Sequence, residues 1–277
     1  MLVFGVDFTS RPRAGKAITC ASAEFVSRTL WVRAVERLET FTDFETLLQR
    51  PGPWIGGFDF PFSLPRPLVA QLGWPLQWRA LMREIAGRSR EQFRALLEAA
   101  RQSRPAGARY LHRATDLPAA SSSPMKLVNP PVGLMLYEGA PRLETSGVTV
   151  YPCAKGDPAR IALEAYPALV ARRVTRASYK TDAGAQQTPQ RRRARAAIIE
   201  AVTWRAREFL GFDVRLPREV ERAARADGSG DVLDAVLCAC CAAWGAARKA
   251  KRYGVPPGAD RLEGWIVGPM PGVRVPA

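Results

Sequence analysis

Two short apolar segments of this 277-residue chain each contain a single aspartate. The segments are Leu2-Val-Phe-Gly-Val-Asp7-Phe8 and Trp54-Ile-Gly-Gly-Phe-Asp59-Phe60, and their aromatic and β-branched residues favour buried strands. A buried carboxylate is costly unless something pairs with it, and a cation between the two strands would remove that cost at both aspartates. The pattern therefore indicates a metal site shared by Asp7 and Asp59.

Three further carboxylates lie where they could complete such a site. Asp231 and Asp234 begin an apolar helical stretch, and Glu164 interrupts the apolar segment 160–166. Mg²⁺ and Mn²⁺ prefer carboxylate oxygens, and two such ions can activate a water and stabilise the leaving oxygen in phosphodiester cleavage. Each carboxylate could instead be a helix cap, a turn residue or the partner of one of the 35 arginines. The candidate catalytic residues, which are also the candidate metal ligands, are Asp7, Asp59, Glu164, Asp231 and Asp234.

The two helical aspartates are expected to have different roles. Asp231 follows a Gly-Ser-Gly turn, so its side chain is predicted to cap the helix by accepting from free backbone N–H groups. Asp234 lies on nearly the same face, where the positive end of the helix dipole favours an ionised metal ligand. Ala235 and Ala239 keep this face narrow, which lets the helix approach the strands. The alternative is that both aspartates only cap the helix.

The chain carries a formal net charge of +15, from 41 Lys and Arg against 26 Asp and Glu. An excess of this size points to a polyanionic partner, and nucleic acid is the commonest of these. Because arginine supplies 35 of the 41 basic residues and alanine is also abundant, genomic base composition could account for the charge alone.

Residues that could contact a substrate phosphate lie in several parts of the chain. Thr9 shares a strand face with Asp7, although its hydroxyl could instead bond within a hairpin. The long segment 103–131 contains the only histidine and is typical of either a functional or a mobile surface loop. The helix expected from Pro189 is rich in arginines, which could bind a polyanion or simply be solvated. His112, Lys126 and Lys180 could each be only a surface charge. The candidate substrate-binding residues are Thr9, His112, Arg113, Lys126, Lys180, Arg191, Arg192 and Arg195.

The five cysteines argue against a structural zinc site and a disulfide framework. Three of them, Cys238, Cys240 and Cys241, lie in one apolar helical stretch, and a single histidine cannot complete a zinc pattern. An odd cysteine count favours a reducing compartment. No signal-peptide pattern and no apolar run of membrane-spanning length is found, so we expect a cytoplasmic protein without a membrane partner.

The order of the expected elements predicts a mixed sheet that carries these residues. Hydrophobic patterning predicts a helix from a capping box at Thr42-Asp-Phe-Glu45 up to Pro51, between the third and fourth strands. Three hairpin-like strands and a helix that crosses to a fourth strand are typical of a mixed α/β sheet. The expected strands are residues 2–10, 16–25, 30–38 and 54–60, followed later by 148–151 and 160–166.

The remaining segments are expected to be mainly helical. Apolar spacing predicts helical structure over residues 67–103, and Thr188 is a favourable N-cap for a helix that continues to Leu210. A short helix from Pro217 and a long one over 231–253 complete the pattern. We therefore expect a single domain over residues 1–277 with a helical and loop insertion at 66–147.

The order of these elements resembles the ribonuclease H-like fold, a mixed β-sheet flanked by helices. The Holliday-junction resolvase branch of that superfamily has a strand aspartate like Asp7 and a late helix with the pattern Asp231-Val-Leu-Asp234-Ala235. The chain is more closely similar to the bacterial and archaeal family called domain of unknown function 429, in which Arg192 would match a helix arginine. This resemblance implies a nuclease of ribonuclease H-like fold with an unnamed substrate. The matching segments are Gly57-Phe-Asp59-Phe-Pro61-Phe62, His112-Arg-Ala-Thr-Asp116, Ser123-Pro-Met-Lys126, Pro131-Val-Gly133-Leu-Met135, Leu163-Glu164-Ala-Tyr166-Pro167, Tyr179-Lys180 and the helix motif.

Three functions are compatible with these residues. The first is a nuclease that uses Mg²⁺ or Mn²⁺ to cleave RNA, DNA or branched DNA. The second is an ATP-dependent phosphotransferase of the actin-like branch, which also begins with a strand aspartate. That branch needs glycine-rich phosphate loops, whereas the segment after Asp7 contains only Gly15 before the next strand. The third is a nucleic-acid-binding protein without catalytic activity. The oligomeric state cannot be derived from the sequence.

Overall fold

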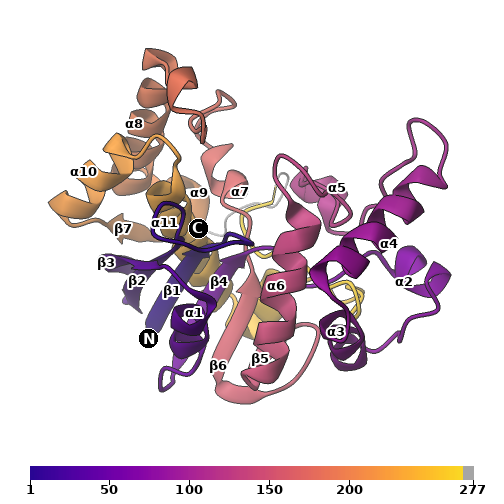
Figure 1. The fold of residues 1–277 in the computed structure, drawn as a ribbon. Coiled ribbons are helices and arrows are strands. Elements are labelled where there is room, and N and C mark those ends of the chain that lie inside the picture. The colour runs from indigo at the N-terminus through magenta and orange to yellow at the C-terminus, as the bar shows by residue number, and fades with distance from the viewer. Residues whose placement is uncertain (271–277) are drawn as a thin grey trace.

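A seven-stranded mixed sheet runs through residues 1–270, the part of the chain that the computed structural model describes (Figure 1). The strand order is β5-β6-β4-β1-β2-β3-β7. β2 is antiparallel to both of its neighbours, and the other pairings are parallel. The strands are β1 (Leu2–Asp7), β2 (Ile18–Val26), β3 (Thr29–Leu38), β4 (Trp54–Asp59), β5 (Val148–Tyr151), β6 (Asp157–Glu164) and β7 (Asp213–Arg215).

The two central strands β1 and β4 are buried on both faces, which explains their nearly continuous apolar sequences. They pair in parallel with Asp7 directly opposite Asp59, at the carboxyl end of each strand. The expected α/β class, a mixed sheet flanked by helices, is confirmed, and the arrangement is consistent with a ribonuclease H-like fold.

The long helix α11 (Asp231–Ala246) packs directly on β1, β2 and β4. Two strand glycines make this close approach possible. A Cβ atom at Gly5 would lie 2.1 Å from the carbonyl oxygen of Ala235 and 2.1 Å from the backbone nitrogen of Ala239. A Cβ atom at Gly57 would lie 2.5 Å from the carbonyl oxygen of Cys238. The expectation that a narrow helix face meets the strands is therefore confirmed.

Further helices cover the same face of the sheet as α11, on one side of Figure 1. Thr188 caps α8 as expected, since its hydroxyl accepts from the backbone N–H of Arg191 at 3.2 Å. The helix expected up to Leu210 is interrupted at Arg205, where the backbone leaves the helical conformation. The last helix ends at Ala246, earlier than expected. The other helices on this side are α7 (Ala168–Ala171), α8 (Pro189–Trp204), α9 (Ala206–Leu210), α10 (Arg218–Ala226) and the short 3-10 helices η1 (Gly184–Gln186) and η2 (Lys249–Gly254).

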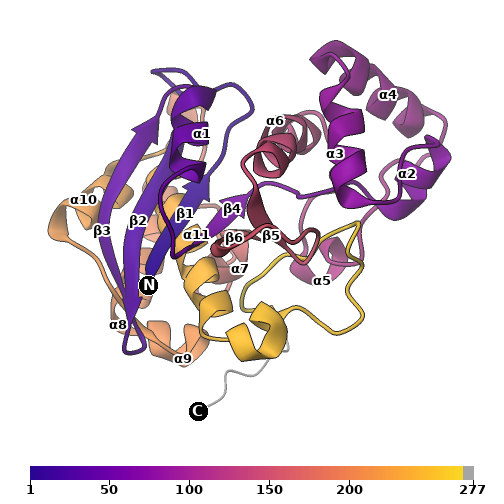
Figure 2. The same cartoon turned by 90° about the horizontal axis from the view of Figure 1, so that it is seen from below.

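The opposite face of the sheet packs on an aromatic core and a second set of helices. Phe8, Phe44, Phe58 and Phe60 contact one another there. Five of these helices lie between β4 and β5, within the segment 66–147, and Figure 2 shows α2, α3 and α4 beside the sheet and not against it. The helices are α1 (Phe41–Leu48), α2 (Arg66–Gln71), α3 (Trp78–Ala86), α4 (Arg90–Gln102), α5 (Asp116–Ala119) and α6 (Val132–Thr145).

The capping box of α1 lies two residues earlier than the sequence indicates. The Thr40 hydroxyl accepts from the backbone N–H of Asp43, and the Asp43 carboxylate accepts from the backbone N–H of Thr40. The prediction of a Thr42–Glu45 box was wrong because Thr40 and Asp43 have the same spacing and form the box two residues earlier, so that the helix begins at Phe41. Among residues 1–270, no helix is both long and apolar enough to cross a membrane.

Candidate metal centre

Three aspartates meet where β1, β4 and α11 come together. One carboxylate oxygen from each of Asp7, Asp59 and Asp234 lies within 4.8 Å of the other two. Asp7 and Asp59 end neighbouring parallel strands, and Asp234 lies in the first turn of the helix that covers them. The Asp234 side chain is fully buried, whereas the two strand aspartates are partly exposed. The prediction that these carboxylates converge at one edge of the sheet is confirmed.

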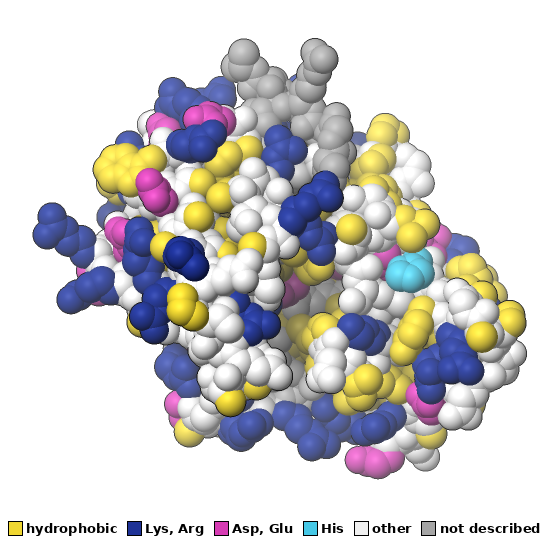
Figure 3. All heavy atoms as spheres, turned by 90° about the horizontal axis from the view of Figure 1, so that it is seen from above, with side chains coloured by type: hydrophobic (Ala, Val, Ile, Leu, Met, Phe, Trp, Pro, Cys, Tyr) yellow, Lys and Arg dark blue, Asp and Glu magenta, His cyan; other side chains and the backbone are white. Residues whose placement is uncertain are grey.

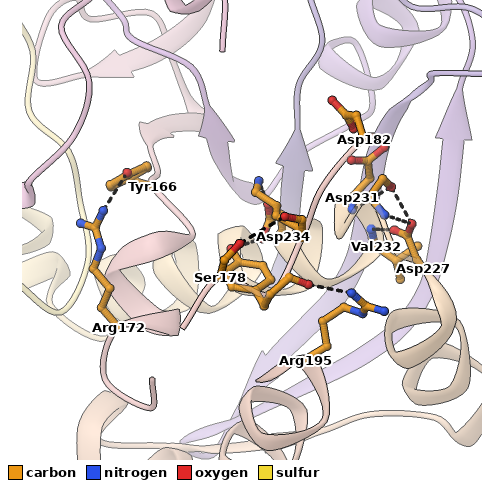
Figure 4. Close-up of polar contacts among 12 residues, drawn as sticks. Tyr166, Arg172, Ser178, Asp182, Arg195, Asp227, Asp231, Val232 and Asp234 are labelled. Atoms are coloured by element: carbon orange, nitrogen blue, oxygen red, sulfur yellow. Dashed lines mark hydrogen bonds and ion pairs between the residues drawn. The ribbon is translucent and has the colours of Figure 1, made fainter. Parts of the chain in front are cut away.

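The turn before α11 aims the helix at this edge. Gly230 has a φ of 82°, a conformation that favours glycine, and it precedes the first helical residue. Asp227 caps the helix, because its carboxylate accepts from the backbone N–H of Val232 at 2.9 Å and from the hydroxyl of Ser229 at 2.5 Å. The prediction that Asp231 caps α11 was wrong, because Asp227 already accepts from the backbone N–H of Val232. Asp231 and Asp227 are both shown in Figure 4.

Burial makes the two strand carboxylates hard to ionise. Burial raises the pKa of Asp7 well above its usual range; Lys180 counteracts this, while Asp234 and Asp231 add to it. Burial likewise raises the pKa of Asp59 to about 7, again opposed by Lys180 and assisted by the charges of Asp234 and Glu164. The aspartates therefore form a crowded anionic site with too little positive charge around it.

A tyrosine and a lysine from the segment before η1 contact the third aspartate. The Tyr179 hydroxyl donates to Asp234 Oδ1 at 2.6 Å, and the Lys180 ammonium forms an ion pair with Asp234 Oδ2. Burial alone would lower the pKa of Lys180, but the negative charge of Asp234, together with Asp7 and Asp59, outweighs it and raises the pKa well above its usual value. The ammonium is therefore a protonated counterion inside the cluster.

Glu164 lies on the other face of the sheet and does not join the three aspartates. In the parallel pairing of β4 and β6, its partner is Phe58 and not Asp59. Because side chains alternate between faces, this one-residue offset turns the carboxylate away from α11. It accepts from Arg113 Nη2 at 2.6 Å and Nη1 at 2.7 Å, and from the backbone N–H of Phe62 at 3.0 Å. The structure thus places Glu164 in a buried ion pair, against the expectation of a metal ligand.

Arg113 is likewise held in buried ion pairs, at the border of the cleft that also contains Asp7 and Asp59. Its side chain is 1% exposed and pairs with two carboxylates, those of Glu164 at 2.6 Å and Asp116 at 2.8 Å. It also donates to the carbonyl oxygen of Glu263 at 3.1 Å. In this structure the guanidinium fixes the 113–116 loop to the sheet through these partners, and its contact with a substrate phosphate stays a prediction.

Asp231 faces the same cleft as the cluster but has a different partner. Lys16 Nζ lies 3.0 Å from Asp231 Oδ1 and 2.8 Å from Asp182 Oδ1, so one lysine joins two acidic segments. Asp231 is not within the group of mutually close ligand atoms formed by the other three aspartates. In this structure it is therefore a neighbour of the cluster and not a member of it.

The arginines of α8 have unequal positions. Arg195 is 3% exposed, and its guanidinium donates to the carbonyl oxygens of Tyr179 at 2.7 Å and Arg225 at 3.3 Å. Arg191 is half-buried and donates to the Gln186 carbonyl, whereas Arg192 is exposed. The expected polyanion contact of Arg195 is corrected: its side chain is buried and fixes the segment that carries Tyr179 and Lys180. Figure 4 shows Arg195 beside the segment that contains Ser178.

A cleft of ≈ 2040 Å³ opens over the cluster. Its lining includes Asp7, Asp59 and several arginines that the sequence analysis did not single out. Figure 3 shows Lys and Arg side chains around a hollow in which acidic side chains are visible. Thr9 and Lys180 line this cleft, but His112, which is exposed, and Lys126, which is half-buried, do not. The sequence reasoning missed three arginines after β6, although the pair that follows the Ala-Tyr-Pro segment was a usable signal. They are Arg172, Arg173 and Arg176.

The chain belongs to the family described as Protein of unknown function (DUF429), whose model matches residues 5–259. The matched region contains all three clustered aspartates and Lys180. No curated protein and no solved structure matches the chain. The family expected from the sequence motifs is therefore confirmed, and its description names no activity.

Proposed function

We propose that this protein is a divalent-metal-dependent nuclease that hydrolyses phosphodiester bonds in RNA or DNA. The observation that carries the proposal is the convergence of Asp7, Asp59 and Asp234, from three separate elements, within 4.8 Å of one another. Such a constellation of oxygen donors at the end of parallel strands suits a hard cation.

The donor set fits Mg²⁺ or Mn²⁺ better than it fits a purely structural role. Asp7 and Asp59 have no ion-pair partner within residues 1–270, and burial raises the pKa of both. Within residues 1–270 the cluster has one ammonium, that of Lys180, and it pairs with Asp234 alone, so the site lacks positive charge. A bound divalent ion would lower the pKa of a water and stabilise the charge that develops on the leaving oxygen.

The residues around the cluster have roles that follow from their positions. Asp7 and Asp59 would hold the cation from the sheet, and Asp234 from the helix. Tyr179 orients the Asp234 carboxylate through its hydroxyl. The exposed guanidinium groups of Arg173 and Arg176 line the cleft and would contact phosphates of the substrate.

The size of the cleft favours an extended substrate. Its volume of ≈ 2040 Å³ exceeds the upper end of small-molecule sites, about 1,000 Å³. Basic side chains around an acidic floor suit a polyanion whose backbone is held at the rim while one phosphate reaches the carboxylates. The net charge of +15 has the sign that this substrate requires.

The test is incubation of the full chain with single-stranded RNA, DNA and branched DNA, in the presence of Mg²⁺, Mn²⁺ or a chelator. We expect metal-dependent cleavage that is lost in Asp7→Asn and Asp59→Asn and retained in the exposed control Asp182→Asn. Cleavage that survives in Asp7→Asn would refute the assigned site. Nucleic-acid binding without cleavage would favour a non-catalytic binding protein, and ATP hydrolysis would favour a phosphotransferase.

A further inference from the structure

Lys180 and a divalent cation would need the same part of the aspartate cluster. We propose that the Lys180 ammonium and the metal ion exclude each other at Asp234, and that metal binding moves this ammonium into the cleft, where it holds a substrate phosphate. The inference rests on the proposed metal site and assigns Lys180 two successive partners.

The first step is the position of the ammonium. Lys180 Nζ pairs with Asp234 Oδ2, while Tyr179 donates to Oδ1 of the same carboxylate at 2.6 Å. Both oxygens of Asp234 are therefore already engaged, and Asp234 is fully buried. A cation that bridges Asp234 to the strand aspartates needs one of these oxygens, and a dication beside an ammonium on the same carboxylate would repel it. The lysine is the partner that must leave.

The second step is that the lysine side chain can leave while its backbone stays. The carbonyl oxygen of Tyr179 accepts from Arg195 at 2.7 Å, and the backbone N–H of Thr181 donates to the carbonyl oxygen of Gly228 at 3.1 Å. These bonds fix the backbone on both sides of Lys180. The lysine side chain is nevertheless 43% exposed, so its flexible stem borders on open cleft. A side-chain swing is therefore sufficient, without movement of the segment.

The third step is a consequence for the substrate. A displaced ammonium in the cleft has lost its carboxylate partner, and a phosphate oxygen would replace that partner. Substrate would then favour the displaced lysine, and the displaced lysine favours bound metal. By thermodynamic reciprocity, nucleic acid should tighten metal binding as much as metal tightens nucleic-acid binding. Lys180 would be the residue that couples the two.

Calorimetric titration of the full chain with Mn²⁺ tests the exchange directly. A hydrogen bond to a charged group contributes about 1.5–3 kcal/mol, so removal of the competitor in Lys180→Gln should tighten Mn²⁺ binding by about tenfold or more. The matched control is Lys16→Gln, which removes a lysine of the same cleft that pairs with Asp231 and not with the cluster. It should leave Mn²⁺ affinity within about threefold of wild type.

The coupling is measured by repeating the titrations with a non-cleavable phosphorothioate oligonucleotide. Wild type should bind Mn²⁺ more tightly when the oligonucleotide is present, and Lys180→Gln should lose this increase. Equal or weaker Mn²⁺ binding by Lys180→Gln, with normal binding by wild type, would overturn the exchange and leave the metal site standing. Absence of Mn²⁺ binding in every variant would overturn the proposed function and this inference together.

A measurement on the wild-type chain covers the case in which Lys180→Gln does not fold. Reductive methylation followed by mass spectrometry reports the accessibility of each lysine. Mn²⁺ should increase the modification of Lys180 and leave the exposed Lys155 unchanged. Modification of Lys180 that stays constant or decreases with Mn²⁺ would overturn the exchange.

Discussion

Replacement of Asp59 by asparagine should stabilise the metal-free protein, although it removes a candidate ligand. Asn has nearly the same shape as Asp and keeps the hydrogen-bonding capacity but not the charge. In the folded chain, Asp59 is close to Asp7 and Asp234, and burial with these charges raises its pKa to about 7. Ionisation of Asp59 therefore opposes folding whenever no metal is bound.

The size and the pH dependence of the effect follow from that pKa. At pH values between 3.8, the usual pKa of Asp, and about 7, the folded state holds a proton on Asp59 that the unfolded state has lost. The free energy of unfolding therefore falls as the pH rises through this range. At about 1.4 kcal/mol per pKa unit, the loss reaches about 4 kcal/mol at pH 8 and only about 2 kcal/mol at pH 5. Asp59→Asn should recover up to these amounts.

Urea unfolding at pH 5 and pH 8 in the presence of a chelator measures both values. We expect Asp59→Asn to be more stable than wild type, with a larger margin at pH 8. Excess Mn²⁺ should reverse part of the difference, because a ligand at one hundred times its Kd stabilises wild type by about 2.7 kcal/mol. If Asp59→Asn is less stable than wild type at pH 8 without metal, Asp59 is held by a favourable partner and the crowding argument is refuted.

Three other substitutions separate the roles of nearby residues. Arg113→Met should destabilise the fold by about 3–5 kcal/mol in urea unfolding, because two buried carboxylates lose their partner; a change within 1 kcal/mol would contradict the core role. Asp234→Asn should abolish the heat of Mn²⁺ binding while Asp231→Asn retains it, and equal loss in both would indicate shared ligation. Arg176→Gln should reduce the salt dependence of nucleic-acid binding by about one counterion, whereas Arg193→Gln on α8 should not; identical slopes would remove the arginine from the interface.

Local pattern was sufficient to predict the central part of the site. Asp7 and Asp59 each interrupt an apolar strand, and Asp234 lies at the start of an apolar helix. Parallel strands present their carboxyl ends at one edge, so residues at those ends converge once the strands pair. The sequence therefore predicts the three-aspartate cluster, although it does not predict its distances.

The face on which a strand residue lies could not be predicted without the register. Glu164 interrupts an apolar strand just as the other two acids do, but it pairs with Phe58 and so points away from Asp59. A slip of one residue exchanges the two faces of a strand. The sequence also does not predict the ion pair between Glu164 and Arg113. Arg113 lies in a loop 51 residues before Glu164, so the pair depends on how that loop packs on the sheet.

Caps and buried arginines were mispredicted for a related reason, since several equivalent residues compete for one position. Asp227 and Asp231 flank the same turn, and the structure uses the first as the cap. Arg191 and Arg195 are one helical turn apart, yet only Arg195 is buried, with 3% of its surface exposed. Its burial follows from the carbonyl groups of Tyr179 and Arg225, which come from segments distant in sequence.

The packing of the core and the geometry of the candidate site have a common cause. Gly5 and Asp7 lie on one face of β1, as Gly57 and Asp59 do on β4, because each pair is two residues apart. The glycines admit the backbone of α11, so the aspartates just beyond them meet the first turn of that helix at Asp234. The candidate ligands are thus set by rigid elements, which is what a site of fixed geometry requires. Lys180, by contrast, comes from a connecting segment and has a long, half-exposed side chain. The fold therefore assigns the fixed charges to strands and helix and the exchangeable charge to a loop.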